Sequence, residues 1–222
     1  MMSEPLEREI DEELRKKQLK SIWDRFGIYL IGLVIVVILS VGGYEAVGYI
    51  NKINSEKTSD QFEYALELVR DNEEVMAKNI FIEISGASTG YGGLSLFNLS
   101  NLSYNNGNYD EALMYLKKAS QNEEISKKIR DFAILRSGFI MLEKNRIEEI
   151  EETLGVLLND GAAFSFHAKE IIALAYYRDG RYKKSSEIFK EISNDASAPS
   201  TISVRAKIFS SQAYSYEDKD SE

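Results

Sequence analysis

The sequence GNYDEAL at residues 107–113 lies between two amphipathic segments, and altered copies of it occur further along the chain. Residues 180–186 read GRYKKSS and occupy the same kind of position, while residues 145–150, NRIEEI, form a degenerate copy. Aligning the first residue of each segment gives spacings of 38 and 35 residues. Self-similarity at a period of this length is typical of proteins built from repeats.

The residues around these three segments also agree in size. Counted from Gly107, Asn145 or Gly180, a small residue stands seven places before the turn, and large apolar residues stand nine places after it. The small residues are Ser100, Gly138 and Ala173, and the residues five, nine and twelve places after the turn are Ala112, Ile150 and Ser185, then Leu116, Leu154 and Phe189, then Ala119, Leu157 and Ile192. This pattern predicts helical hairpins in which a Gly or Asn ends the first helix in the left-handed conformation.

Each such hairpin leaves an apolar face that only a neighbouring hairpin can cover, so the hairpins are expected to stack. The spacing is close to the tetratricopeptide repeat of about 34 residues. A last amphipathic segment, residues 201–216, has no partner hairpin and is predicted to be a capping helix. We therefore predict an all-α fold, with an N-terminal transmembrane helix followed by a tetratricopeptide-like (TPR) α-solenoid of about three helical hairpins plus a capping helix. The alternative is an irregular helical bundle.

Composition excludes several kinds of function. The 222 residues include no Cys and a single His, His167, so we expect no catalytic centre, no metal site and no cofactor. His167 is expected to be a partly buried structural residue. The formal net charge is −9, which argues against nucleic-acid binding because phosphate contacts need clustered Lys and Arg.

The transmembrane prediction rests on residues 26–44, FGIYLIGLVIVVILSVGGY, which contain no charged residue. At about 1.5 Å per residue in a helix, this stretch spans about 28 Å, close to the thickness of a bilayer core. A buried core helix is one alternative. A signal peptide is another, although its apolar region is typically about 7–15 residues long.

The charges beside this stretch predict its orientation. Residues 14–25 carry five Lys and Arg, whereas residues 45–60 carry two. The positive-inside rule therefore places the N-terminus in the cytoplasm. We expect a cytoplasmic basic, amphipathic arm at residues 1–25, a single-pass transmembrane helix at 26–50 in the bacterial inner membrane, and a periplasmic TPR-like domain at 51–222. An apolar stripe of Leu6, Ile10 and Leu14 marks the arm either as a docking helix or as a solvated extension.

The order of these elements resembles the YfgM-like family of ancillary subunits of the bacterial SecYEG translocon. The sequence Tyr91-Gly92-Gly93-Leu94-Ser95-Leu96 is similar to the phrase that opens the first repeat helix of that family. The resemblance implies a non-enzymatic role, with the SecYEG translocon and a PpiD-type periplasmic chaperone as partners and newly exported, unfolded proteins as possible clients. An adaptor for another cell-envelope assembly complex is the alternative, and the oligomeric state is left open.

In TPR arrays the first helices of successive hairpins line the concave face, where partners bind. By the register of the repeats, the predicted partner-binding residues are Phe97, Asn101, Tyr104, Leu135, Phe139, Leu142, Leu174, Tyr177 and Arg178, together with Asn105, Glu143 and Glu170. Apolar residues at such positions suit a helix or an unfolded segment of a partner. The alternative is that several of them are covered by the capping helix or by a neighbouring loop.

Overall fold

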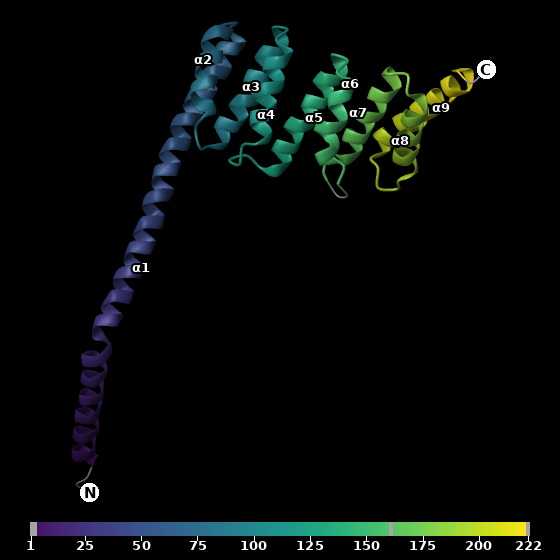
Figure 1. Ribbon diagram of the computed structural model, residues 1–222. Coiled ribbons are helices and arrows are strands. Elements are labelled where there is room, and N and C mark those ends of the chain that lie inside the picture. The colour runs from purple at the N-terminus through teal and green to yellow at the C-terminus, as the bar shows by residue number, and fades with distance from the viewer. Residues whose placement is uncertain (1–3, 160–161, 221–222) are drawn as a thin grey trace. The chain divides into compact units, whose positions relative to one another are not determined.

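The computed structural model describes residues 4–159 and 162–220, and these contain helices and no strand (Figure 1). The chain divides into two compact units, Met1–Asn54 and Ser55–Glu222. The helices are α1 (Glu4–Arg70), α2 (Glu74–Ser85), α3 (Gly90–Asn105), α4 (Tyr109–Ser120), α5 (Lys127–Glu143), α6 (Ile147–Leu154), the 3-10 helix η1 (Gly155–Leu157), α7 (Ser165–Arg178), α8 (Tyr182–Asn194) and α9 (Ser200–Asp220). The prediction of an all-α fold is confirmed.

The first unit contains the apolar stretch, which is helical throughout. The large side chains that the structure describes in it are exposed, as Leu39 illustrates with 69 % of its surface accessible. Within the described residues, α1 holds the one segment long and apolar enough to cross a membrane, and none of its apolar window is buried. Among the described residues, this window is therefore not covered as a core helix would be. The side chains of residues 1–13 lie outside the described part, so the apolar stripe of the arm stays a prediction.

The second unit is built on four turns of one kind. Asn72, Gly107, Asn145 and Gly180 have φ angles of 63°, 77°, 57° and 76°. In each turn the N–H of this residue donates to the carbonyl three residues earlier, and the next N–H donates to the carbonyl five residues earlier. These two bonds define a Schellman motif, which satisfies carbonyls left free at a helix end. The three predicted hairpins are confirmed, and the turn at Asn72 adds a fourth before them, made by the end of α1 and by α2.

The close pairing of small and large residues inside the hairpins is also confirmed. A Cβ atom added at Gly138 would lie 2.8 Å from both methyl carbons of Leu154, the large residue predicted to fill that space. In the added hairpin, Ala65 and Phe81 occupy the same two positions and are fully buried. Because these contacts repeat with the turn, the second unit is a regular solenoid and not an irregular bundle.

Two glycines of the 91–96 sequence have a packing role at the start of α3. A Cβ at Gly92 would lie 2.5 Å from the carbonyl oxygen of Ala87, and a Cβ at Gly93 would overlap the side chain of Ile125. Neither position has space for a side chain, because atoms of Ala87 and Ile125 approach them closely. The phrase that carries the family resemblance is thus also a structural requirement of this chain.

Helix α9 closes the solenoid, as predicted for a capping helix. Ile202, Ala206 and Ala213 are buried. The ring of Phe209 stacks on Phe189 of α8 with their centroids 5.4 Å apart. The helix begins at residue 200, one residue earlier than predicted, and covers the apolar face left by the last hairpin.

Candidate partner-binding face

The predicted partner-binding residues lie on α3, α5 and α7, the first helices of the second, third and fourth hairpins. We call the side of these helices that packing leaves at least partly accessible the A-face. The A-face comprises Phe97, Asn101, Tyr104, Phe132, Arg136, Phe139, Glu143, Leu174 and Arg178. Phe139 lies in the middle helix, and half of its surface is exposed.

Two of the predicted residues belong to the core and not to this surface. Leu135 and Leu142 are 3 % and 7 % exposed and belong to the hydrophobic core. Their role in binding a partner stays a prediction, and the structure brings neither side chain to the surface beside Phe139.

Polar contacts join neighbouring first helices across the A-face. Nη2 of Arg136 donates to Oδ1 of Asn101, 2.7 Å away, which links α5 to α3. The hydroxyl of Tyr104 donates to the carboxylate of Glu143, which links the same two helices again, three residues further along α3 and seven further along α5. Nη1 of Arg178 donates to the carbonyl oxygen of Leu142 at 2.5 Å and so links α7 to α5. Hydrogen bonds therefore connect the three helices across the A-face, and apolar side chains are exposed between these bonds.

The hydrogen bond between Tyr104 and Glu143 affects both groups. It raises the pKa of the Tyr104 hydroxyl and lowers the pKa of the Glu143 carboxyl from their ordinary values. Glu143 is therefore a carboxylate at neutral pH, and one of its acceptor positions is already occupied by the hydroxyl.

An aromatic row at one end of the A-face joins the predicted Phe97 to Phe132 and Phe164, which the register of the repeats does not predict. The ring of Phe132 stacks on Phe97 and contacts Phe164, with centroid distances of 6.0 Å in each case. Phe164 meets His167 edge-on, and His167 is half-buried, as expected of a structural residue. Phe132 precedes Phe139 by seven residues on α5, so the two share one side of that helix, and this spacing is the signal that indicates Phe132.

The other end of the A-face is covered by the capping helix. The ring of Tyr177 contacts Phe209 and Tyr216 of α9, with centroids 6.0 and 6.2 Å apart. Burial, before other causes, raises the pKa of the Tyr177 hydroxyl. Glu170 is buried and accepts two hydrogen bonds from Arg205 of α9, at 2.6 and 2.8 Å. These two predicted residues therefore hold α9 in place.

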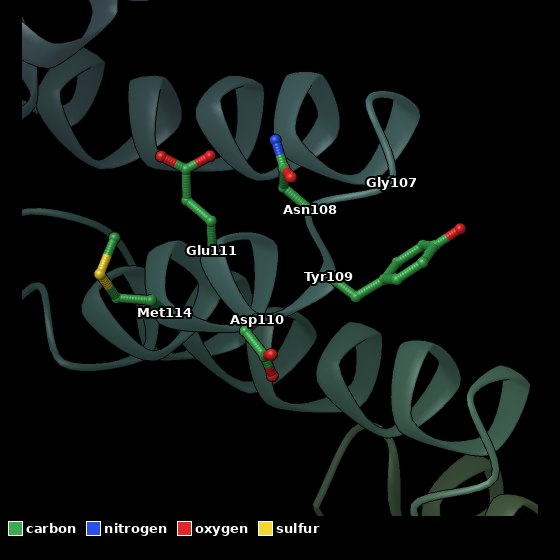
Figure 2. Close-up of a pocket in the computed structure, with 6 residues that line it drawn as sticks. All are labelled: Gly107, Asn108, Tyr109, Asp110, Glu111 and Met114. Carbon is green, nitrogen blue, oxygen red and sulfur yellow. The ribbon is translucent and has the colours of Figure 1, made fainter.

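A shallow hollow lies at the turn of the second hairpin (Figure 2). Its lining residues are Gly107, Asn108, Tyr109, Asp110, Glu111 and Met114. In Figure 2, Glu111 points toward a neighbouring helix, whereas Tyr109 and Asp110 point in other directions. The Glu111 carboxylate accepts hydrogen bonds from Lys78 at 2.8 Å and from Ser103 at 2.7 Å. The hollow thus contains a hydrogen-bonded link between the first and second hairpins.

The described residues offer no obvious place for a metal ion. No group of three or more His, Asp or Glu side chains among them is arranged to hold one.

The comparison with protein families agrees with this geometry. The family described as tetratricopeptide repeat-like domain matches residues 20–208, which include the apolar stretch and all four hairpins. The chain belongs to this family, whose repeat domains are typically scaffolds for protein interaction. No curated protein and no solved structure matches the chain.

Proposed function

We propose that this protein is a membrane-anchored, non-enzymatic scaffold for protein–protein interaction, and that it is an ancillary subunit of the SecYEG translocon. In this proposal it works with a PpiD-type periplasmic chaperone on newly exported proteins. The observation that carries the scaffold role is the A-face, where the rings of Phe132 and Phe139 on the middle helix are 43 % and 50 % exposed. An exposed aromatic residue on a rigid surface is a typical anchor for a partner.

The exposed apolar side chains of residues 26–44 support the membrane anchor. Val36, Ile38 and Leu39 are each more than half exposed, and no described part of the chain covers this window. A continuous apolar surface of this length is unfavourable in water, and a bilayer removes it from water. The excess of Lys and Arg before the stretch supports a cytoplasmic N-terminus and a periplasmic repeat domain, at the bacterial inner membrane.

The translocon and the chaperone enter the proposal through the resemblance to the YfgM-like family. Support for it comes from the 91–96 sequence and from the order of an anchor, an early helix pair, repeats and a final helix. The match to the tetratricopeptide repeat-like family extends over both the apolar stretch and the repeats, which is compatible with this order.

The test is co-purification of the full chain from membranes extracted with a mild detergent. We expect translocon subunits and a periplasmic foldase in the recovered complex. Phe139→Ser is expected to reduce their recovery several-fold, because it removes an exposed apolar anchor without opening a cavity in the core. Val156→Ser, which changes an exposed residue on η1 away from the A-face, serves as the matched control.

Two results would count against the proposal. Recovery of envelope-assembly proteins in place of the translocon would favour the alternative adaptor role. Unchanged recovery of partners with Phe139→Ser would show that the A-face is not the contact surface. Tyr177 is unsuitable for this test because its ring packs against α9, so that its replacement would also disturb the cap.

A further inference from the structure

Phe139 lies between two guanidinium groups along the axis of α5. Arg136 precedes it by three residues on the same helix, and Arg178 of α7 donates to the carbonyl of Leu142, three residues after it. With a rise of about 1.5 Å per residue, a separation of three residues corresponds to about 4.5 Å along the helix. The exposed ring is therefore flanked by a positive charge on either side.

Neither of these guanidinium groups forms an ion pair within hydrogen-bonding distance in the described structure. Arg136 donates to the neutral amide oxygen of Asn101, and its Nε is buried without a hydrogen-bond partner among the described residues. Arg178 donates to a backbone carbonyl. Two other arginines of the same domain differ, because Arg146 and Arg205 each donate twice to a carboxylate.

The local charge around Phe139 is opposite to that of the domain. Residues 51–222 contain 21 Lys and Arg against 28 Asp and Glu, a net charge of −7. Among the A-face residues, however, the charged ones are Arg136, Arg178 and Glu143, so two guanidinium groups stand beside one carboxylate. That carboxylate already accepts the Tyr104 hydroxyl and lies 3.4 Å from Lys144.

We propose that the A-face binds a polypeptide segment in which a carboxylate side chain lies beside an apolar one. The apolar side chain packs on Phe139 and Leu174, and carboxylates accept hydrogen bonds from Arg136 and Arg178. This inference rests on the proposed function, since it names the chemistry of the segment that the scaffold recognises.

The physical basis is the pairing that guanidinium groups prefer. Arginine forms planar, charge-assisted hydrogen bonds with carboxylates, which are stronger than its bonds to neutral oxygens. The negative net charge of the domain as a whole opposes the approach of an acidic segment elsewhere on it. The A-face thus selects acidic apolar segments from among apolar ones.

The test uses the full chain purified in detergent and two fluorescent synthetic peptides. One peptide carries leucines flanked by glutamates, and in the other each glutamate is replaced by glutamine. We expect the acidic peptide to bind about tenfold more tightly, as hydrogen bonds to charged groups are stronger than neutral ones. Its affinity alone should fall as salt concentration rises.

The variant Arg136→Gln with Arg178→Gln should abolish this preference while binding of the glutamine peptide is retained. Lys183→Gln and Lys184→Gln together are the matched control, since they remove the same charge from the exposed side of α8. Circular dichroism of each variant establishes that it is folded.

Equal binding of the two peptides to the unaltered protein would overturn the carboxylate inference and leave the scaffold proposal standing. If neither peptide bound and Phe139→Ser left the recovery of partners unchanged, both the carboxylate inference and the scaffold proposal would be overturned. If sedimentation showed that the arginine variant dissociates a dimer, the occupant of the face would be a second copy of this chain, and the peptide inference would be wrong.

Discussion

At Gly138 the two helices of the third hairpin approach so closely that a single added methyl group has no space. Both methyl carbons of Leu154 lie 2.8 Å from the position of that Cβ. We expect Gly138→Ala to lower the free energy of unfolding by about 1–3 kcal/mol, the usual cost of overpacking a core. Denaturant unfolding of the full chain in detergent, followed by circular dichroism, measures this change.

Gly155 provides the control for this substitution. It lies at the end of α6 in the same hairpin, and a Cβ added there would meet nothing within 4 Å. Gly155→Ala should leave the unfolding midpoint nearly unchanged. Equal effects of the two substitutions would contradict the close approach at Gly138 and with it the packing role of the small position in each repeat.

Single residues of the candidate site were harder to predict than the residues of the core. The register of the repeats correctly places Phe139 on an exposed side of α5, because that side is fixed by the helical period. The same register does not say which positions a neighbouring element covers. Tyr177 contacts α9, and Glu170 pairs with Arg205 of that helix. These contacts join residues far apart in the sequence, so no local pattern indicates them.

At the scale of elements, one carboxylate links three helices of neighbouring hairpins. Glu111 of α4 accepts hydrogen bonds from Lys78 of α2 and Ser103 of α3. The bond from Lys78, followed by that from Ser103, lowers the pKa of Glu111 from its ordinary value of 4.5. The bond to Glu111 likewise raises the pKa of Lys78 from 10.5. Both groups are therefore charged throughout the neutral range and stabilise the packing of the first two hairpins.

The shift at Glu111 predicts how stability depends on pH. Because the pKa is lowered on folding, the stabilisation is fully present above pH 4.5 and is lost as the pH falls through the lower, folded-state pKa. Glu111→Gln should therefore reduce stability at pH 7 and flatten its decline in acid. Denaturant unfolding at a series of pH values measures both effects. Glu148→Gln, at an exposed position of α6, is the control, and an equally flattened profile there would contradict the assignment to Glu111.

The elements themselves follow largely from the sequence, with one instructive exception. The turns at Gly107 and Gly180 are followed two places later by Tyr, and the turn at Asn145 by Ile. The turn at Asn72 is followed there by Glu74, so the pattern that reveals the others is absent. Its backbone is nevertheless the same, with φ of 63° and the same two hydrogen bonds. Asn tolerates the left-handed conformation. The buried residues Ala65 and Phe81 occupy the small and the large position of the repeat.

At the scale of the whole molecule, charge is distributed unevenly about the apolar stretch. Residues 1–50 carry a net charge of −2 and residues 51–222 a net charge of −7, yet the segment just before the stretch is strongly basic. Lys and Arg near a transmembrane helix determine its orientation, whereas Asp and Glu contribute little. The acidic character of the repeat domain is therefore compatible with export. The A-face, with Arg136 and Arg178 against Glu143, differs in charge from the domain as a whole.

This distribution predicts the topology and what would change it. A reporter enzyme fused after Glu222 and active only outside the cytoplasm should be active in a bacterial host. Changing Lys16, Lys17 and Lys20 to Gln leaves two Lys and Arg in residues 14–25, the same number as in residues 45–60. Because the bias in positive charge is then removed, we expect a mixture of orientations and a marked loss of reporter activity. Lys183→Gln with Lys184→Gln, far from the stretch in sequence, should leave the activity unchanged. Activity of the unaltered fusion only in a reporter that needs the cytoplasm would reverse the proposed orientation.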